Sequence, residues 1–389
     1  MFCLPTMPKA LLAFRSELED FCTEFVRPVA AQIDAEDEIP KSLWPALGHA
    51  GLLGITIPKA FGGRGLGFWA HAMAIEVLSR ASGTVGFAYA DHSNICLHNL
   101  YVHGSDAQRQ RYVPKLCSGE YLGALSMSEP NAGSDIVGCM SCHAQKQGDA
   151  WVANGTKRWT TNGPDADVII VYMRTADKNA GSHSISAFLL DNTIPGWHRG
   201  PKVDKLGMRG AGNCELFFEQ CPIPQAHLLG AENEGVRVLM AGLDSERLLL
   251  AAGPLGLMQA ALDLVLPYIR QRRQFGRAIG EFELIQAKVA EMYTALQTAR
   301  AYLYQTAQAF DAGHPSRIDA AACAFYASQA AVKVALEAIQ TMGGVGYLND
   351  CVAGRLLRDA KIYEIGGGTN EIRKMLIGRE LFKAAGEQE

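Results

Sequence analysis

The chain has 389 residues, of which 48% are hydrophobic and 20% are charged, and its formal net charge is -4 at pH 7. This composition is ordinary for a globular protein, and the negative charge argues against a general nucleic-acid binder, which needs a basic surface. At roughly 100–200 residues per domain, the length predicts two or three domains.

The sequence gives no expectation of a membrane protein. The longest run of apolar residues, glycine and proline is Leu248–Met258, whereas a membrane helix needs roughly 20 residues. The N-terminus shows no basic region followed by an apolar stretch and a cleavage site. The ten cysteines are scattered along the chain. We therefore expect a cytoplasmic protein with reduced thiols that does not bind a membrane.

Residues 1–122 are predicted to form an N-terminal helical domain. Ala10–Glu38 has apolar residues at helical spacing, and Ile39-Pro40 ends the pattern. Trp69–Arg80 and Asp106–Leu116 are predicted as further helices.

Residues 123–231 are predicted to form a small middle β domain. Asp167–Thr175 and His183–Asp191 are rich in strand-forming residues, and Asn154-Gly155 predicts a hairpin turn. Such short, closely spaced strands favour a compact barrel or sandwich over a parallel sheet. Cys139–His143 fits the haem attachment pattern C-x-x-C-H, but without an export signal we interpret it as a chance match and expect no metal site.

Residues 232–389 are predicted to form a C-terminal helical domain. Gly235–Ile269, Leu284–Ala312 and Ile318–Gln340 are long segments rich in strong helix formers. Helices of this length predict a bundle. The fold class is therefore mainly α with a central β domain.

One carboxylate stands on an apolar helix face. Leu239, Leu243 and Leu250 share a face of the first long C-terminal segment, and Glu246 falls on the same face. Burying a carboxylate is costly unless it is paired or protonated, and burial raises its pKa toward the range of a general base. The residues alone leave two interpretations open: a catalytic base, or a partner of a neighbouring arginine.

Three further segments carry side chains suited to a large polar ligand. Met127–Asp135 offers hydroxyls and backbone N–H groups, Trp159–Gly163 sets a ring beside hydroxyls, and Arg270–Phe275 sets phosphate-binding arginines near a helix end. Each also has a plainer interpretation: a surface turn, a core tryptophan and a solvated charged run.

In this order, these segments resemble the acyl-CoA dehydrogenase family over nearly the whole chain. The diagnostic stretches are Leu125–Asp135, Lys157–Gly163, Leu206–Arg209, Arg272–Gly276, Gln340–Gly346 and Arg355–Lys361. The resemblance implies an FAD enzyme with a C-terminal four-helix bundle that is usually a homotetramer. It also implies α,β-dehydrogenation of an acyl-CoA, with electrons passed to an electron-transferring flavoprotein. Stretches that resemble the isovaleryl-CoA branch are Gly242–Met258, His92–Asn94 and Tyr363–Gly366.

The resemblance also implies roles for individual residues. Most members carry the base at the position of Gly367, whereas isovaleryl-type members carry it at the position of Glu246, which is the expected base here. The residues expected at the flavin are Leu125, Met127, Ser128, Gly133, Ser134, Trp159, Thr161, Glu283, Thr369 and Glu371. Residues expected to reach the FAD of a neighbouring subunit are Arg272, Phe275, Gln340, Gly343 and Gly344. Those expected at the acyl-CoA are Phe87, Ser134, Asp244, Arg247, Gly367 and Gly368.

The stretch that borders the acyl pocket in the family departs from the isovaleryl branch. Phe87 replaces a smaller aliphatic residue, Ala90-Asp91 replaces Gly-Ala, and Gly367 lacks a methyl group that is usually present. The preferred acyl chain is therefore left open among short, medium or branched acyl-CoAs. An oxygen-using flavin oxidase or monooxygenase on the same fold, and a non-catalytic acyl-CoA-binding protein, are the alternatives.

Overall fold

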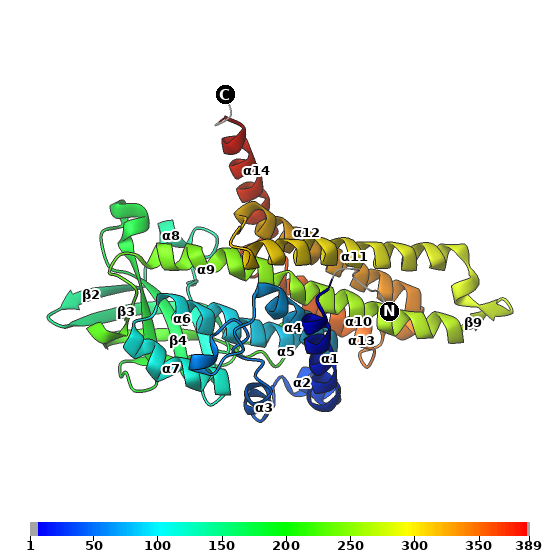
Figure 1. Ribbon diagram of the computed structural model, residues 1–389, viewed down its shortest axis with the longest axis horizontal. Coiled ribbons are helices and arrows are strands. Elements are labelled where there is room, and N and C mark those ends of the chain that lie inside the picture. Colours follow the sequence, from blue (N-terminus) through cyan, green and yellow to red (C-terminus); the bar gives the residue numbers. More distant parts are fainter. Residues whose placement is uncertain (1–6, 387–389) are drawn as a thin grey trace.

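The computed structural model describes residues 7–386, with the sheet at one end of the molecule and the long helices extending away from it (Figure 1). The predicted helices at Trp69–Arg80 and Asp106–Leu116 are confirmed. Ala10–Glu38 is not one helix, because π- and 3-10 turns around Pro28, which has no backbone N–H to donate, interrupt it. The elements are α1 (Lys9–Phe21), α2 (Ala30–Glu36), α3 (Leu43–His49), α4 (Phe68–Ala81), α5 (Gly83–Ala90), the π-helix η4 (Asp91–His98), α6 (Asn99–His103) and α7 (Asp106–Ser118).

Within the described residues, the middle of the chain forms an eight-stranded sheet that is mostly antiparallel. The predicted hairpin turn at Asn154-Gly155 is wrong, because both residues lie inside β3, where a bulge shifts the register against β7. The chain instead reverses at Gly148, whose φ of 61° suits glycine. The strands are β1 (Gly123–Ser126), β2 (His143–Gln147), β3 (Ala150–Thr161), β4 (Val168–Arg174), β5 (Ile185–Asp191), β6 (Trp197–Arg199), β7 (Asn213–Pro224) and β8 (Leu228–Leu229).

The C-terminal part returns to long helices, which confirms the mainly α fold class with a central β domain. The predicted helix Gly235–Ile269 is divided at Ala251, because Pro254 cannot donate a hydrogen bond to the carbonyl of Leu250. A small hairpin, β9 (Arg273–Gln274) and β10 (Arg277–Ala278), lies at the end of the molecule opposite β2 (Figure 1). The helices are α9 (Gly235–Leu250), α10 (Ala252–Gln271), α11 (Glu283–Asp311), α12 (Arg317–Met342), α13 (Val352–Ile362) and α14 (Asn370–Gly386).

Two helical stretches, Gly235–Gln271 and Arg317–Tyr347, are long and apolar enough to cross a membrane by length and composition alone. They are 78% and 50% buried inside the fold, and the core helix of a soluble protein meets the same criteria. The stretches are therefore weak evidence for a membrane span, and the expectation that the protein does not bind a membrane stays a prediction.

Helix α9 lies where the helical domains meet the sheet. One apolar core contains Leu97 of η4, Ile170 of β4 and Leu239 of α9 together. Helix α9 packs closely against η4 and α6. A Cβ atom on Gly242 would lie only 2.6 Å from the side-chain amide of Asn99. Only glycine permits that approach. As a result, residues on the next turn of α9 face the start of η4.

A buried ionic network fastens α4 to the C-terminal bundle. Glu76 is only 1% exposed, and its carboxylate accepts a hydrogen bond of 2.7 Å from Nη2 of Arg300 on α11. The hydroxyl of Tyr304 donates to the same carboxylate, and Arg15 lies 3.9 Å away. These partners compensate the cost of burying the charge.

Replacing Glu76 with glutamine is expected to lower the free energy of unfolding by about 3–5 kcal/mol, because it leaves Arg300 buried without its counter-charge. Chemical denaturation measures this change. Glu17→Gln is the matched control, since the partly exposed Glu17–Arg64 pair should contribute less than about 1 kcal/mol. Equal unfolding midpoints for the two variants would show that the network does not join the domains.

Candidate active site

Glu246 of α9 and the glycine loop before α14 come together in space. A Cβ atom at position 367 would lie 3.0 Å from Oε1 of Glu246 and 2.7 Å from Cδ2 of Leu250. Gly367 also has a φ of 65°, in the region that favours glycine. The glycine therefore leaves the space that the carboxylate of Glu246 occupies, and a side chain at position 367 would compete with it.

Glu246 is only partly exposed, and desolvation raises its pKa to about 7, although Arg247 and Arg373 oppose the shift. Neither arginine forms an ion pair with it within residues 7–386. Arg247 instead lies 3.2 Å from Asp244, and Arg373 donates to the backbone carbonyls of Tyr363 and Gly366. The geometry thus favours the base over the paired carboxylate of the two interpretations left open by the sequence.

A second carboxyl group, that of Asp91 at the start of η4, faces the same space. Burial, together with the charge of Glu246, raises the pKa of Asp91 to about 7, and the side chain of Thr161 opposes this shift. In the sequence, Asp91 stood out only because it differs from the residue usual in the isovaleryl branch. No other feature of the sequence indicated that Asp91 lies near Glu246. Arg373 was missed altogether, because an arginine near a helix start gives no sign of being buried.

The wall beside Asp91 is built by β1, the segment after it and the end of β3. The backbone N–H of Arg158 donates to the carbonyl of Ser128 at 2.8 Å, which holds the two segments together. Ser126 and Thr160 share a hydrogen bond of 2.7 Å between their hydroxyls. Trp159 is 53% exposed. The guanidinium of Arg158 lies over the Trp159 ring at 4.3 Å from its centre, and such a partly exposed ring beside hydroxyls fits a planar heterocycle such as flavin.

The remaining residues predicted on this wall are placed consistently with a ligand surface. Leu125, Met127 and Ser128 are partly exposed, and Ser134 is exposed. A Cβ atom on Gly133 or Gly368 would meet no atom within 4 Å, so open space lies next to both. Thr369 and Glu371 stand at the start of α14, where the hydroxyl of Thr369 accepts a hydrogen bond from the N–H of Ile372. No interaction assigns any of these residues to the flavin, and their roles stay predictions.

A second group of predicted cofactor residues lies elsewhere in the chain. Arg272 ends α10, and Phe275, which is 93% exposed, occupies the turn between β9 and β10, at the end of the molecule away from β2 and β3 (Figure 1). The single chain therefore does not bring the side chains of this hairpin to Thr161. The exposed residues of this group also include Glu283, Gln340, Gly343 and Gly344.

The residues predicted to contact the acyl-CoA also lie in two separate places, near the loop of Gly367 and on α9. Phe87 packs edge-on against Tyr363, with ring centres 5.7 Å apart, beside the loop that holds Gly367. Asp244 lies 3.2 Å from Arg247 and 3.6 Å from Arg317. Arg247 is only 6% exposed, so its contact with CoA stays a prediction.

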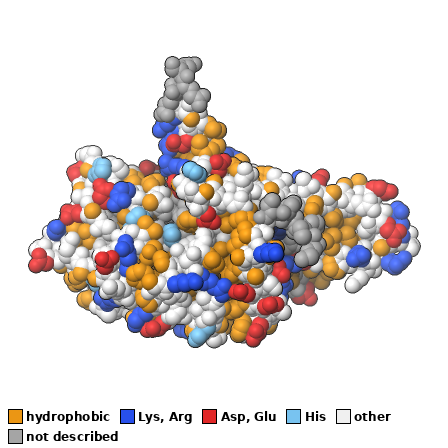
Figure 2. All heavy atoms as spheres, viewed as in Figure 1, with side chains coloured by type: hydrophobic (Ala, Val, Ile, Leu, Met, Phe, Trp, Pro, Cys, Tyr) orange, Lys and Arg blue, Asp and Glu red, His pale blue; other side chains and the backbone are white. Residues whose placement is uncertain are grey.

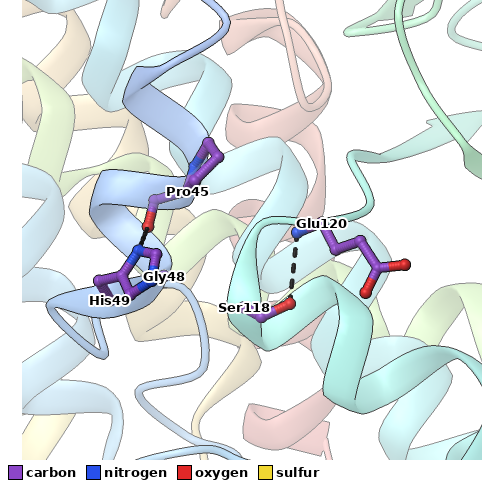
Figure 3. A pocket seen from close by; sticks show the side chains of 5 residues that line it. All are labelled: Pro45, Gly48, His49, Ser118 and Glu120. Atoms are coloured by element: carbon purple, nitrogen blue, oxygen red, sulfur yellow. Dashed lines mark hydrogen bonds between the residues drawn. The ribbon is translucent and has the colours of Figure 1, made fainter.

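A separate surface pocket lies between α3 and the end of α7 (Figure 3). Its polar groups are occupied locally: Nδ1 of His49 lies 2.8 Å from the carbonyl of Pro45, and the N–H of Glu120 donates to the hydroxyl of Ser118. None of the predicted catalytic or cofactor residues lines it. The candidate active site is instead placed where Glu246 meets the loop of Gly367, with Asp91 near enough for the charge of Glu246 to affect its pKa.

The chain belongs to the acyl-CoA dehydrogenase family and is an FAD-dependent oxidoreductase. It matches the N-terminal domain of that family over residues 8–120, the middle domain over residues 124–221 and the C-terminal domain over residues 233–382.

Individual relatives agree with this assignment. The chain is 53% identical to a mitochondrial isovaleryl-CoA dehydrogenase of Oryza sativa subsp. japonica over 95% of this chain and 90% of that one. It is 51% identical to a mitochondrial 2-methylacyl-CoA dehydrogenase of Solanum tuberosum over 95% and 90%. The structure of butyryl-CoA dehydrogenase from Megasphaera elsdenii superposes with a TM-score of 0.94 at 33% identity, over 98% of this chain and all of that one.

The expectation of a cytoplasmic location is wrong. Isovaleryl-CoA dehydrogenases at 50–53% identity, from plants and mammals, are mitochondrial proteins. The expectation rested only on a missing export pattern, and an absence of one pattern is not positive evidence for a compartment.

Gly367→Leu is expected to lower the rate of flavin reduction by acyl-CoA by about 10²-fold, because a side chain larger than the single methyl group of the isovaleryl branch would displace the carboxylate of Glu246. Anaerobic stopped-flow absorbance measures the rate. Gly354→Leu on α13 is the control, since a Cβ there meets nothing within 4 Å. A Gly367→Leu enzyme as fast as the control would mean that the carboxylate does not depend on this space.

Proposed function

We propose that the protein dehydrogenates a short branched acyl-CoA, with isovaleryl-CoA giving 3-methylcrotonyl-CoA, and that Glu246 is the catalytic base. The observation that carries this proposal is the position of Glu246: partly buried, unpaired with any arginine within residues 7–386, and lodged in the space that Gly367 leaves. A carboxylate with a pKa of about 7 suits a general base at neutral pH.

In this proposal the chain's own residues align the thioester and remove one proton. The backbone N–H of Gly367 donates to the thioester carbonyl and stabilises the negative charge that develops on its oxygen. A carboxylate oxygen of Glu246 takes the proton from the α-carbon. Residues such as Ser128, Trp159 and Thr161 would hold FAD, whose chemistry would be to take up the hydride of the β-carbon, so that the substrate would lose two hydrogens and become a 2,3-enoyl-CoA. An electron-transferring flavoprotein is the proposed electron acceptor.

The choice among branched chains depends on the region around Phe87. Its edge-on packing against Tyr363 fixes the ring close to the loop of Gly367, where it would limit the length of the acyl group. The 2-methylacyl-CoA dehydrogenase of Solanum tuberosum is as similar in sequence to this chain as an isovaleryl-CoA dehydrogenase is. A 2-methylacyl-CoA is therefore the second candidate substrate.

Glu246→Gln is expected to slow flavin reduction by isovaleryl-CoA about 10²–10⁴-fold, since the amide cannot accept the α-proton. In the wild type, kcat/KM should rise as the pH rises through about 7, because Glu246 must lose its proton to act as the base. Anaerobic absorbance near the flavin maximum, with a panel of acyl-CoAs, checks both outcomes. A variant that reduces its flavin at the wild-type rate would remove Glu246 from the mechanism. Fast reduction by a different acyl-CoA alone would change the substrate and leave the base in place.

The proposal includes a homotetramer in which one subunit completes the FAD site of another. Arg272 and Phe275 project from the hairpin at the end of the molecule farthest from the sheet (Figure 1), where a second copy could receive them. Apolar side chains gather on the bundle that leads to this hairpin (Figure 2). A groove between α10 and α11 is lined by Leu262, Leu266, Ile269, Val289 and Ala290, of which Leu266 is exposed while Leu262 and Ile269 are buried. Exposed apolar side chains of this kind are typical of a protein interface.

Arg272→Ala is expected to lower the ratio of bound FAD to protein, because an arginine that binds phosphate bidentately contributes charge-assisted hydrogen bonds. Absorbance of the purified protein measures the ratio. Arg237→Ala on α9 is the control, since its one ion pair, with Glu234, lies on the protein surface. If the Arg272→Ala enzyme retains FAD as fully as the control, the hairpin does not reach a cofactor.

A further inference from the structure

Two buried side chains of opposite charge tie the second half of β3 to the segment between β1 and β2. Lys157 is 0% exposed and Glu129 is 3% exposed. Nζ of Lys157 donates to Oε1 of Glu129 at 2.8 Å and to the backbone carbonyl of Met127 at 2.9 Å. The carboxylate of Glu129 also accepts hydrogen bonds from the hydroxyl and the N–H of Ser141 and from the N–H of Cys142. The ion pair therefore fixes β3 relative to both ends of the segment between β1 and β2.

Strand β3 carries an extra residue directly after this ion pair. Lys157 faces Leu216 of β7 and Thr160 faces Cys214, so that three steps along β3 correspond to two along β7. Trp159 lies in this bulge with a φ of 68°, in the left-handed region, where a bulky side chain is an outlier. A backbone conformation of this kind persists only where the surrounding structure enforces it, and it is typical of functional sites.

The neighbours of Trp159 along β3 supply this constraint. The side chain of Lys157 is held by the ion pair, and Thr160 is 0% exposed and shares a hydrogen bond of 2.7 Å with the hydroxyl of Ser126 on β1. The chain is thus fixed on both sides of the bulge, and the ring of Trp159 lies outside, where it is 53% exposed. A half-exposed aromatic ring in a strained backbone is a large surface made available to a ligand.

We propose that Lys157 and Glu129 are positioning residues for the dehydrogenation: their ion pair holds the bulge of β3 that presents the ring of Trp159 to the cofactor. This inference rests on the proposed function, in which Trp159 helps to hold FAD. Apolar side chains of similar volume would stabilise a fold about as well as a buried ion pair. They would not fix a direction, whereas the ammonium of Lys157 bonds two specific oxygen atoms, on Met127 and Glu129.

The first test compares variants of the FAD-loaded full-length protein by the visible circular dichroism of the bound flavin and by the rate of its reduction. Lys157→Met and Glu129→Gln are made together, so that no unpaired charge is left buried. This double variant should alter the flavin spectrum and slow reduction by the fastest acyl-CoA by about tenfold or more, since small displacements cost alignment. The matched control is Lys146→Met with Glu232→Gln, which removes an ion pair on the protein surface.

Glu129→Asp is a second variant in case the double variant does not fold. It keeps both charges but shortens the reach of the carboxylate to Lys157, and should alter the flavin spectrum in the same direction. A spectrum and a rate equal to those of the surface-pair control, in whichever of these variants folds, would overturn the proposal.

Trp159→Gly decides whether the ion pair acts through the ring, because glycine removes the ring and adopts a φ of 68° without strain. In this background, removing the ion pair should have no further effect on the flavin spectrum or on the rate. A further loss as large as in the wild-type background would show that Lys157 and Glu129 act independently of Trp159, and would overturn the proposal.

Chemical denaturation tests the strain at position 159 without reference to the cofactor. Trp159→Ala retains a Cβ atom at the positive φ, so it should unfold at a lower denaturant concentration than Trp159→Gly. The reverse order would show that the bulge holds no strain and would overturn the proposal. If no acyl-CoA reduces the wild-type flavin, the proposed function fails, whereas the flavin spectrum and the unfolding midpoints still decide the role of the ion pair.

Discussion

The desolvation of one carboxylate is the constraint on which the site depends. Glu246 stands where helix, sheet and glycine loop meet, and burial raises its pKa to about 7. Such a shift persists only if no positive charge makes direct contact with the carboxylate, because a direct ion pair would lower the pKa again. The chain meets this condition by giving Arg247 and Arg373 other partners, namely Asp244 and backbone carbonyls.

Small residues make this arrangement possible at two positions. Gly242 allows α9 to approach Asn99, and Gly367 allows the loop before α14 to lie against the carboxylate. A side chain at either position would push apart elements that carry opposite walls of the site. The reactivity of the site thus depends on small residues at these two positions as well as on the carboxylate of Glu246. In a closely packed region, even a small displacement of the carboxylate would move it out of alignment with the substrate.

Sequence reasoning predicted the fold class, which is confirmed, and proposed Glu246 as the base, because both leave periodic or motif-like signals. Glu246 lies on a helix face lined by leucines, and the long helical segments are rich in strong helix formers. The turn at Asn154-Gly155 was wrong because local turn preference yielded to a bulge in a long strand. Asp91 and Arg373 received no role, because their importance arises from neighbours far away in the sequence. The separation of Arg272 and Phe275 from the other cofactor residues was already implied by the family resemblance, which assigns them to the FAD of a neighbouring subunit, and the hairpin lies away from β2 and β3 accordingly (Figure 1).

The ionic network around Glu76 also bears on how the chain can be divided. Glu76 belongs to the N-terminal helical region and Arg300 to the C-terminal bundle, and both are buried in one continuous apolar core that contains Leu78 and Leu257. Sequence boundaries near residues 122 and 231 therefore do not mark units of independent stability. A fragment cut at either place would expose apolar core and an uncompensated buried charge, so the two helical regions should unfold cooperatively despite the sheet that separates them along the chain.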